Sequence, residues 1–160
     1  MSRTFTIRRP TIQDRDAWLE MRQALWPDCS HSEQVREIEV TITTKTDVAF
    51  VAESQSGQVV GFVEASLRSF AEGCETSPVG YVEGWFVRPE HRRQGIGQAL
   101  VAAAEQWAVE QGCFEMASDA RIENTAIQQA HLAIGYEETS RLVCFKRRLV
   151  VNGEGSSEGR

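Results

Sequence analysis

A basic segment containing two glycines carries the clearest chemical pattern in this sequence. The segment is Arg92-Arg93-Gln94-Gly95-Ile96-Gly97-Gln98, and it joins an expected strand to an expected helix. The first N–H groups of a helix lack an intrahelical acceptor and carry partial positive charge, so they attract anions. Two arginines beside them add cationic donors. The pattern therefore predicts a phosphate or pyrophosphate site, although a glycine turn flanked by solvated arginines would give the same residues.

The strand expected just before this segment, Val79–Val87, is interrupted at Gly84. A glycine inside an apolar strand often marks a bulge or the close approach of another backbone. A bulge here would separate the strand from its neighbour and expose the backbone of Trp85, Phe86 and Val87. An extended chain such as a pantetheine arm would fit that gap, where an N–H group could polarise a thioester carbonyl. The alternative is a glycine that serves packing alone.

Two acidic residues lie next to these elements. Glu83 stands within the apolar strand, where a carboxylate is costly unless it is paired or functional. It could hold a substrate ammonium or accept its proton, and the alternative is an ion pair with a surface arginine. Asp119 follows an expected strand, Cys113–Ser118, at the carboxyl end where ligand sites cluster in α/β sheets. Its alternative role is that of a loop or capping residue.

Four further residues carry weaker patterns. Asn124 can cap the last expected helix or contact a ligand. His131 is a lone histidine on that helix, where packing is a commoner role than catalysis, although its ordinary pKa suits proton transfer. Trp26 and Phe70 flank loops, so each can stack on a sugar or belong to the core.

The elements that must position these residues alternate along the chain. A strand around Phe5 and Ile7 is followed by two helices, which start after the capping residues Thr11 and Ser30. This order predicts an α/β domain with a mixed central sheet, helices on both faces, and a right-handed parallel crossover over 79–118. The later elements are expected as a hairpin over 48–53 and 59–68, a strand over 79–87, a helix over 98–111, a strand over 113–118, a helix over 124–134, and one or two strands within 136–149.

Length and composition limit the possible functions. The 160 residues fit one domain, expected over 1–151, with a flexible tail at 152–160. A net charge of −6 disfavours nucleic acid as a partner. No apolar run reaches the roughly 20 residues that a membrane span needs, and the first residues lack the apolar stretch of a signal peptide. The four scattered cysteines fit a reducing cytoplasm and disfavour a structural metal.

Several short motifs together resemble one branch of a known superfamily. With the Arg-x-x-Gly-x-Gly loop, they are similar to the aminoglycoside 6′-N-acetyltransferases of the GCN5-related N-acetyltransferase superfamily. The resemblance runs from about Ile7 to Arg147 and implies the fold of that superfamily, whose mixed, mostly antiparallel sheet is splayed at the acetyl-CoA site. The motifs are Leu25-Trp26-Pro27, Thr76-Ser77-Pro78-Val79, Val82-Glu83-Gly84, Met116-Ala117-Ser118-Asp119, Glu123-Asn124-Thr125 and Gly135-Tyr136-Glu137-Glu138-Thr139.

The resemblance implies an enzyme that moves an acetyl group from acetyl-CoA to the 6′-amine of an aminoglycoside by direct attack, and so confers antibiotic resistance. It also implies a cytoplasmic homodimer. Glu83, Asp119 and His131 would be the catalytic residues, with His131 standing where many superfamily members have a tyrosine. The antibiotic would contact Trp26, Phe70, Glu83, Asp119 and Ser140. Acetyl-CoA would contact Trp85, Phe86, Val87, Arg92, Arg93, Gln94, Gly95, Ile96, Gly97, Gln98 and Asn124.

Two other functions fit the same residues. An acetyltransferase of the same fold could act on a polyamine or a protein amine, because acidic site residues suit those cationic substrates as well. A non-catalytic sensor could bind acyl-CoA without transferring the acyl group. The release of CoA with a panel of amines would separate all three functions.

Overall fold

A five-stranded sheet forms the centre of the computed structural model, which describes residues 4–152. The strands follow one another across the sheet in chain order: β1 (Phe5–Arg8), β2 (Asp47–Ser54), β3 (Val59–Arg68), β4 (Val79–Val87) and β5 (Met116–Ser118). The first three pairs are antiparallel, and only β4 and β5 run parallel. The expected mixed, mostly antiparallel sheet is therefore confirmed.

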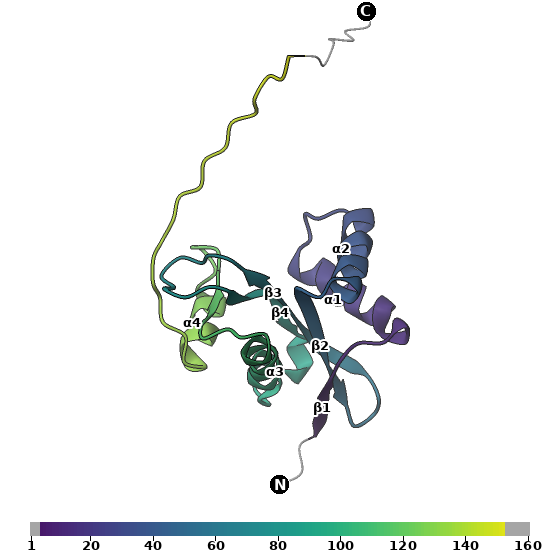
Figure 1. Ribbon diagram of the computed structural model, residues 1–160. Coiled ribbons are helices and arrows are strands. Elements are labelled where there is room, and N and C mark those ends of the chain that lie inside the picture. The colour runs from purple at the N-terminus through teal and green to yellow at the C-terminus, as the bar shows by residue number, and fades with distance from the viewer. Residues whose placement is uncertain (1–3, 153–160) are drawn as a thin grey trace, which may run out of the picture.

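Helices cover both faces of the sheet, as Figure 1 shows. On one face, α1 (Arg15–Leu25) and α2 (His31–Thr43) bury Trp18, Met21 and Ile38 against Phe62 of β3. On the other face, α3 (Ile96–Glu110) lies on a second apolar cluster, and the chain just after α4 (Thr125–Ala133) packs against the same cluster. Two short 3-10 turns, Ile12–Asp14 and Pro89–His91, complete the order of elements. The sheet thus separates two cores, and its edges remain available for the site.

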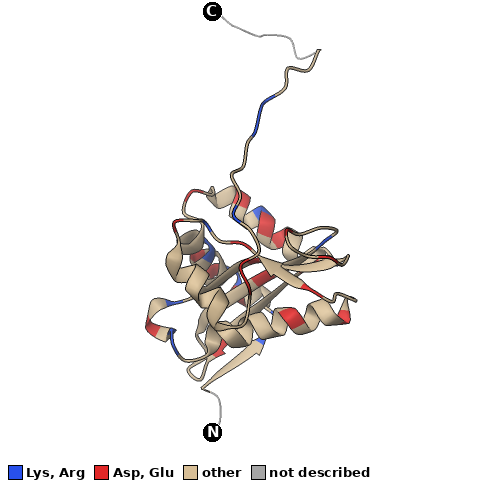
Figure 2. Ribbon diagram, turned by 90° about the vertical axis from the view of Figure 1, so that its left-hand side faces the viewer, with Lys and Arg blue, Asp and Glu red and all other residues tan. Residues whose placement is uncertain are grey.

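The expected strands within 136–149 are wrong for this chain taken alone. Residues 137–152 contain no helix or strand, and they run outward from the domain near α4 (Figure 1). Val143, Phe145 and Leu149 are 80%, 91% and 75% exposed, and basic residues lie among them (Figure 2). The apolar pattern is typical of a strand, but a strand is stable only where a neighbour pairs with its backbone groups. Of the tail expected at 152–160, only residue 152 falls within the described residues.

Asp14 joins the first strand to the first helix. Its carboxylate accepts hydrogen bonds from Arg8 Nη1 (2.7 Å) and Nη2 (2.9 Å) and from the backbone N–H of Thr11 (2.6 Å). The Arg8 guanidinium is the main cause that holds the pKa of Asp14 below its ordinary value. The ionised carboxylate therefore stabilises the folded state, and this contribution is lost as the pH falls through the lowered pKa.

We expect Asp14→Asn to reduce the free energy of unfolding by about 1–2 kcal/mol at pH 7, because a charge-assisted contact is lost. The difference between the variant and the parent protein should shrink below pH ~4, where the unfolded carboxyl group also becomes protonated. Urea denaturation at several pH values measures this difference. A penalty that stays the same from pH 7 to pH 3 would show that the charge of Asp14 does not cause it.

Candidate functional site

The site is built around an irregularity in β4. Gly84 pairs with Glu64 of β3, and Val82 pairs with Ala65, so Glu83 is an extra residue without a partner on β3. On the other side, β4 pairs with β5 only as far as Val82 and Ser118. The bulge expected near Gly84 is therefore present. Beyond Val82, no strand of the described residues pairs with this edge of β4, which leaves backbone groups open along Glu83–Val87.

Gly84 is needed because an aromatic ring occupies the place of its side chain. A Cβ atom at this position would overlap the Cη2 and Cζ2 atoms of Trp26. Trp26 follows α1, is half-buried, and packs edge-on against Phe62 with ring centroids 6.2 Å apart. The bulge and the Trp26 ring therefore form one unit, and part of the indole stays exposed.

The glycine loop before α3 has the backbone geometry of an anion site. Gly95 is left-handed, with a φ of 82°, and it is the N-cap of α3 without a capping side chain. The N–H of Ala99 is the first to bond within the helix, to the Gly95 carbonyl at 3.1 Å. The N–H groups of residues 96–98 precede it and therefore have no intrahelical acceptor. Their direction and the helix dipole favour a phosphate group.

The second glycine of this loop makes room for Trp85. A Cβ atom on Gly97 would lie 2.9 Å from Cζ2 and Nε1 of the Trp85 indole. Trp85 and Val87 pack toward α3, whereas Phe86, between them, packs with Phe62 on the other face at a centroid distance of 6.3 Å. The side chains of Trp85, Phe86 and Val87 thus alternate between the two faces of the sheet. Their backbone groups lie along the edge of β4 that β5 does not pair with.

The other residues expected to bind the cofactor differ in which of their groups, side chain or backbone, a ligand can reach. The Nε atom of Arg92 donates to the Val87 carbonyl at 2.8 Å, which ties the loop to the end of β4. Arg93, Gln94 and Gln98 are exposed, so their side chains are accessible to a ligand. Ile96 is only 3% exposed and packs into the core, so it can offer a ligand its N–H group alone.

Glu83 and Asp119 are both held by neighbouring side chains. Glu83 accepts a hydrogen bond from Ser66 Oγ at 2.5 Å and a two-pronged ion pair from Arg68, whose Nη2 lies 2.9 Å from both carboxylate oxygens. Tyr81 donates its hydroxyl to Asp119 Oδ2 at 2.6 Å. Burial and this hydrogen bond raise the pKa of Tyr81 above its ordinary value, so the hydroxyl stays protonated.

Two further acidic residues belong to this region and were missed by the sequence analysis. Asp47 begins β2, and burial, with the charge of Glu83 as a second cause, raises the pKa of its carboxyl group. Glu115 precedes β5 and accepts hydrogen bonds from the backbone N–H groups of Glu75 (2.8 Å) and Thr76 (2.7 Å). It therefore fixes the β3–β4 loop that carries Phe70. Only the spatial proximity of the strands reveals these two residues, because neither stands in a recognisable motif.

His131 has both ring nitrogens engaged by protein groups. Nδ1 lies 2.7 Å from the Ile127 carbonyl oxygen, which can only accept, so this nitrogen carries a proton. Nε2 lies 2.8 Å from Ser118 Oγ, at the end of β5 where the pairing with β4 stops. The ring also contacts Trp85 edge-on, with centroids 5.4 Å apart. Ser118, which the sequence analysis did not single out, therefore stands between His131 and the open edge of β4.

The remaining expected site residues lie at the margins. The Asn124 side-chain oxygen accepts from the Ile127 N–H at 3.1 Å and caps α4, which leaves its amide NH₂ available to a ligand. Phe70 is 64% exposed in the β3–β4 loop, as expected of a stacking surface rather than a core residue. Ser140 is exposed in the outward-running segment, and no hydrogen bond joins it to Glu83 or Asp119 among the described residues. The structure does not bring Ser140 to the acids.

A buried ion pair lies beneath the Trp26 ring. Arg22 and Glu64 have side chains 2% and 8% exposed and are joined by two hydrogen bonds. Trp18 Nε1 donates to Glu64 at 2.8 Å, and Arg22 Nε donates to Gln34 at 3.0 Å. The Arg22 guanidinium lies 4.6 Å from the centre of the Trp26 ring. Since Glu64 pairs with Gly84, the ion pair connects the α1–α2 layer to the bulge.

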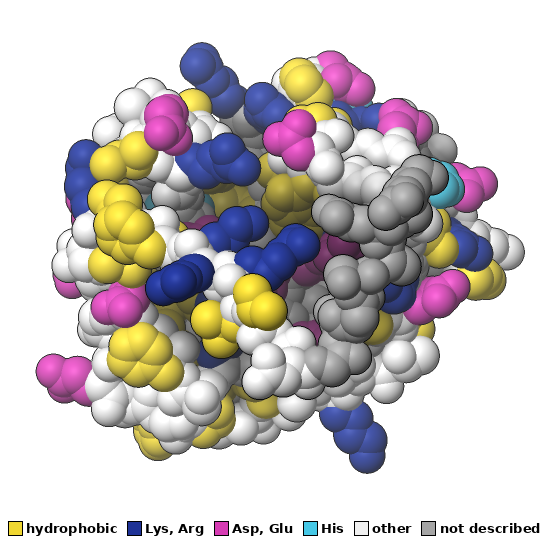
Figure 3. Space-filling view, turned by 90° about the horizontal axis from the view of Figure 1, so that it is seen from above, with side chains coloured by type: hydrophobic (Ala, Val, Ile, Leu, Met, Phe, Trp, Pro, Cys, Tyr) yellow, Lys and Arg dark blue, Asp and Glu magenta, His cyan; other side chains and the backbone are white. Residues whose placement is uncertain are grey.

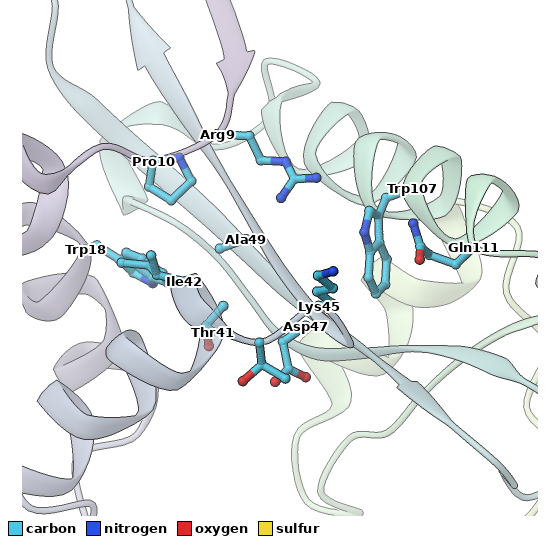
Figure 4. A pocket seen from close by; sticks show the side chains of 11 residues that line it. Arg9, Pro10, Trp18, Thr41, Ile42, Lys45, Asp47, Ala49, Trp107 and Gln111 are labelled. Atoms are coloured by element: carbon cyan, nitrogen blue, oxygen red, sulfur yellow. The ribbon is translucent and has the colours of Figure 1, made fainter.

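A pocket of about 380 Å³ lies elsewhere, along the part of β2 that extends beyond β1. Side chains of the α1–α2 layer, including Trp18 and Ile42, face Trp107 of α3 and Gln111, the residue after α3, across it (Figure 4). None of the residues that the sequence predicted to bind cofactor or substrate lines this pocket, although Asp47, whose pKa burial and the charge of Glu83 raise, lies at its border. The candidate site is therefore the open edge of β4 and not this pocket.

The described residues, 4–152, contain neither a metal-binding cluster nor a membrane-spanning helix. No group of three or more His, Cys, Asp or Glu side chains is arranged to hold a metal ion. No helix in this range is both long and apolar enough to cross a bilayer. Seen from the end where the C-terminal segment leaves, the surface mixes cationic and acidic side chains rather than showing one sign (Figure 3).

This site combines three features: an open edge of β4, a helix start without a capping side chain, and two acidic residues. Together they are typical of an acyltransferase that uses acyl-CoA. The model of the acetyltransferase (GNAT) family matches residues 16–136, and the chain belongs to that family. Within it, the chain is 41% identical over 145 residues to aminoglycoside N(6′)-acetyltransferase type 1 of Stenotrophomonas maltophilia, covering 90% of this chain and 94% of that protein. The enzyme of the same name from Klebsiella aerogenes is also 41% identical, covering 89% and 96%.

Solved structures of such enzymes have the same fold. Aminoglycoside 6′-N-acetyltransferase AAC(6′)-Ih from Acinetobacter baumannii superposes with a TM-score of 0.86 at 36% identity, over 91% of this chain and 99% of that one. AAC(6′)-Iy in complex with the bisubstrate analogue CoA-S-monomethyl-acetylneamine gives the same TM-score at 35% identity, again over 91% and 99%. The expected fold and family are therefore confirmed.

Proposed function

We propose that this protein is an acetyl-CoA-dependent aminoglycoside 6′-N-acetyltransferase. The observation that supports this function most strongly is the placement of Glu83 as the extra residue of the bulge. The same irregularity lies where the pairing of β4 with β5 stops, and Glu83 immediately precedes Gly84, the residue that packs against the Trp26 ring. A polycationic sugar needs both a carboxylate and a stacking surface. The relatives named above act on this class of substrate.

Acetyl-CoA is the co-substrate, with its pyrophosphate on the N–H groups of residues 96–98 and its pantetheine arm along the open edge of β4. Trp85 fixes the geometry of both parts, because its indole fills the space that Gly97 leaves. A backbone N–H of β4 would then polarise the thioester carbonyl as negative charge develops on it. The side chains of Arg92, Arg93, Gln94, Gln98 and Asn124 are proposed to complete the cofactor site.

Glu83 is proposed to receive the proton of the substrate amine, directly or through a water. The neutral amine then attacks the thioester carbonyl, the new C–N bond forms, and CoA leaves as a thiolate. Asp119 holds a further ammonium of the substrate, and Trp26 and Phe70 bracket its rings. The part of Ser140 in substrate binding stays a prediction, since no contact supports it.

The departing thiolate can be protonated from the His131–Ser118 pair. Nδ1 of His131 is fixed by the Ile127 carbonyl, and Nε2 faces the Ser118 hydroxyl at the point where β4 and β5 separate. In the imidazolium form of His131 both ring nitrogens carry a proton; the Nε2 proton moves to the Ser118 oxygen while the serine gives its own proton to sulfur, which leaves CoA as a thiol and His131 neutral with its proton on Nδ1. The His131–Ser118 pair would thus be the proton donor in place of the tyrosine that many members of the superfamily have at the position of His131.

One assay tests the proposed function. The release of CoA from acetyl-CoA is followed with neamine, which has a 6′-amine, with paromamine, which has a 6′-hydroxyl, and with spermidine. We expect release with neamine only, and resistance to aminoglycosides with a 6′-amine when the protein is expressed in a susceptible bacterium. Release with spermidine alone would favour a polyamine acetyltransferase. Binding of acetyl-CoA without release by any amine would favour a sensor.

We also propose that the protein is a homodimer and that it works in the cytoplasm. The cytoplasm is where an enzyme can modify an antibiotic before the antibiotic reaches the ribosome. The outward-running segment 137–152 supports the dimer, because it exposes the apolar side chains of Val143, Phe145 and Leu149. The outer edge of β5 has no pairing strand among the described residues. A second copy of the chain offers both parts a partner, since each needs an unpaired strand edge.

We expect Phe145→Asp to shift the protein from dimer to monomer, because a charge cannot be buried at an apolar strand interface. Sedimentation velocity at micromolar concentration measures the shift. Ile12→Asp, a change at another exposed apolar residue, is the matched control and should leave the dimer intact. A parent protein that sediments as a monomer would contradict the dimer.

A further inference from the structure

Arg68 occupies the carboxylate that a substrate ammonium would need. Its Nε and Nη2 atoms lie 3.0 and 2.9 Å from Glu83 Oε1, and Nη2 lies 2.9 Å from Oε2. The carboxylate oxygens of Glu83 therefore already accept most of their hydrogen bonds from the protein, since Oε1 also accepts one from the Ser66 hydroxyl. An ammonium reaching Glu83 must compete with a guanidinium that is already there.

The same guanidinium also touches the second acid of the site through an aromatic ring. Arg68 Cζ lies 3.5 Å from the centre of the Tyr81 ring, and the Tyr81 hydroxyl donates to Asp119. A cation on the ring face is attracted by its quadrupole, so this contact persists when the ion pair is broken. Arg68 can therefore stay on the Tyr81 ring when its ion pair with Glu83 is broken.

The ion pair is weak enough to exchange. The side chains of Arg68 and Glu83 are 42% and 35% exposed, so water screens their attraction. The side chains of the ion pair Arg22–Glu64 are only 2% and 8% exposed. Water does not screen this pair, which therefore stays in place. Exposed pairs contribute up to about 1 kcal/mol, which an ammonium held by several acids exceeds.

We propose that Arg68 is a displaceable counter-cation that sets the site's preference for polycationic substrates. The inference rests on the proposed function and adds a specificity-determining residue to it. In the free enzyme Arg68 neutralises Glu83, and the 6′-ammonium of the substrate replaces it. A ligand with one weak cationic group gains too little from this exchange, whereas one whose other ammonium groups bind Asp119 and Asp47 can make it.

A positioning role would have the opposite consequence. If Arg68 instead held Glu83 in its working orientation throughout the reaction, its loss would weaken substrate binding and slow turnover. If Arg68 competes with the substrate, its loss strengthens binding. A gain of affinity cannot arise from damage to the fold, so the direction of the change separates the two roles.

The test uses Arg68→Gln, which keeps a polar, unbranched side chain, shorter than that of arginine, and removes its charge. The dissociation constant of neamine is measured by calorimetry with acetyl-CoA absent, and the KM for neamine is measured by CoA release. We expect both to fall about three- to fivefold, the latter figure corresponding to about 1 kcal/mol. The decrease should be smaller at high salt, where the ion pair is already screened. Arg68→Lys should fall between the parent and Arg68→Gln.

Arg36→Gln is the matched control, because Arg36 is an exposed arginine on α2 whose nearest acid is Glu33, 3.8 Å away. It should leave both constants unchanged. Neamine binding to Arg68→Gln that is unchanged or weaker would overturn the inference. If the parent protein binds neamine but releases no CoA with it, the proposed function fails while the competition is still measured by calorimetry. If the parent protein does not bind neamine, both fail.

Discussion

Arg22→Met should reduce the free energy of unfolding by about 3–5 kcal/mol, because it leaves a buried charge without its partner. The substitution leaves the Glu64 carboxylate only 8% exposed and without its cationic partner. The charge cannot be rehydrated, and Trp18 Nε1 is the one remaining donor in the described contacts of Glu64. Equilibrium unfolding in urea, followed by tryptophan fluorescence, measures the loss.

The double variant Arg22→Met/Glu64→Leu is the control for this first expectation. It removes both charges, so it should lose much less stability than the single variant. If the two single changes simply add in the double variant, the ion pair contributes nothing as a pair. The double variant also tests the site, because Trp26 loses the guanidinium beneath its ring. We expect its KM for the aminoglycoside to rise while its KM for acetyl-CoA stays the same.

Glu83→Gln should lower kcat for aminoglycoside acetylation by about 10²–10⁴-fold, the range typical of a lost general base. The amide keeps the size of the side chain and leaves the bulge in place. The dissociation constant of acetyl-CoA should not change, because the cofactor elements are the backbone of β4 and the glycine loop. Steady-state kinetics and calorimetry with acetyl-CoA measure the two quantities separately.

Glu39→Gln is the matched control for the second expectation. Glu39 lies on α2 with its side chain 65% exposed, and its ion pair with Arg15 is long, at 3.9 Å. Its kcat should equal that of the parent protein. Turnover by Glu83→Gln within threefold of the parent would remove Glu83 from proton transfer and leave it only a binding role.

The backbone features of the site could be predicted from the sequence because they depend on local residue types. Gly84 marks the bulge, and Gly95 adopts the left-handed conformation that ends the loop before α3. Asn124 and Ser30 cap their helices, as short polar side chains do. In each of these cases the residue and the structure it determines lie within a few positions of each other.

The polar partners of the site could not be predicted in this way. Arg68 and Glu83 are 15 positions apart, and Arg22 and Glu64 are 42 apart, so only the paired strands and packed helices bring them together. In the sequence, an ion pair of Glu83 is an alternative to a function for this residue, whereas in the structure the ion pair is formed by the residue that is best placed for function. The strands expected within 136–149 fail for a related reason, because a strand depends on a neighbour that need not belong to the same chain.

The extra residue in β4 makes chain length, and not only residue type, a requirement for this enzyme. Strand residues alternate between the two faces, so a β4 shorter by one residue would bring its later side chains into the regular register of β3. Such a strand would lose the extra residue that carries the carboxylate and the irregularity next to which its pairing with β5 stops. Single-residue deletions at 83–84 should therefore be less tolerated than any substitution there, and natural variation in this family should preserve the length of the strand.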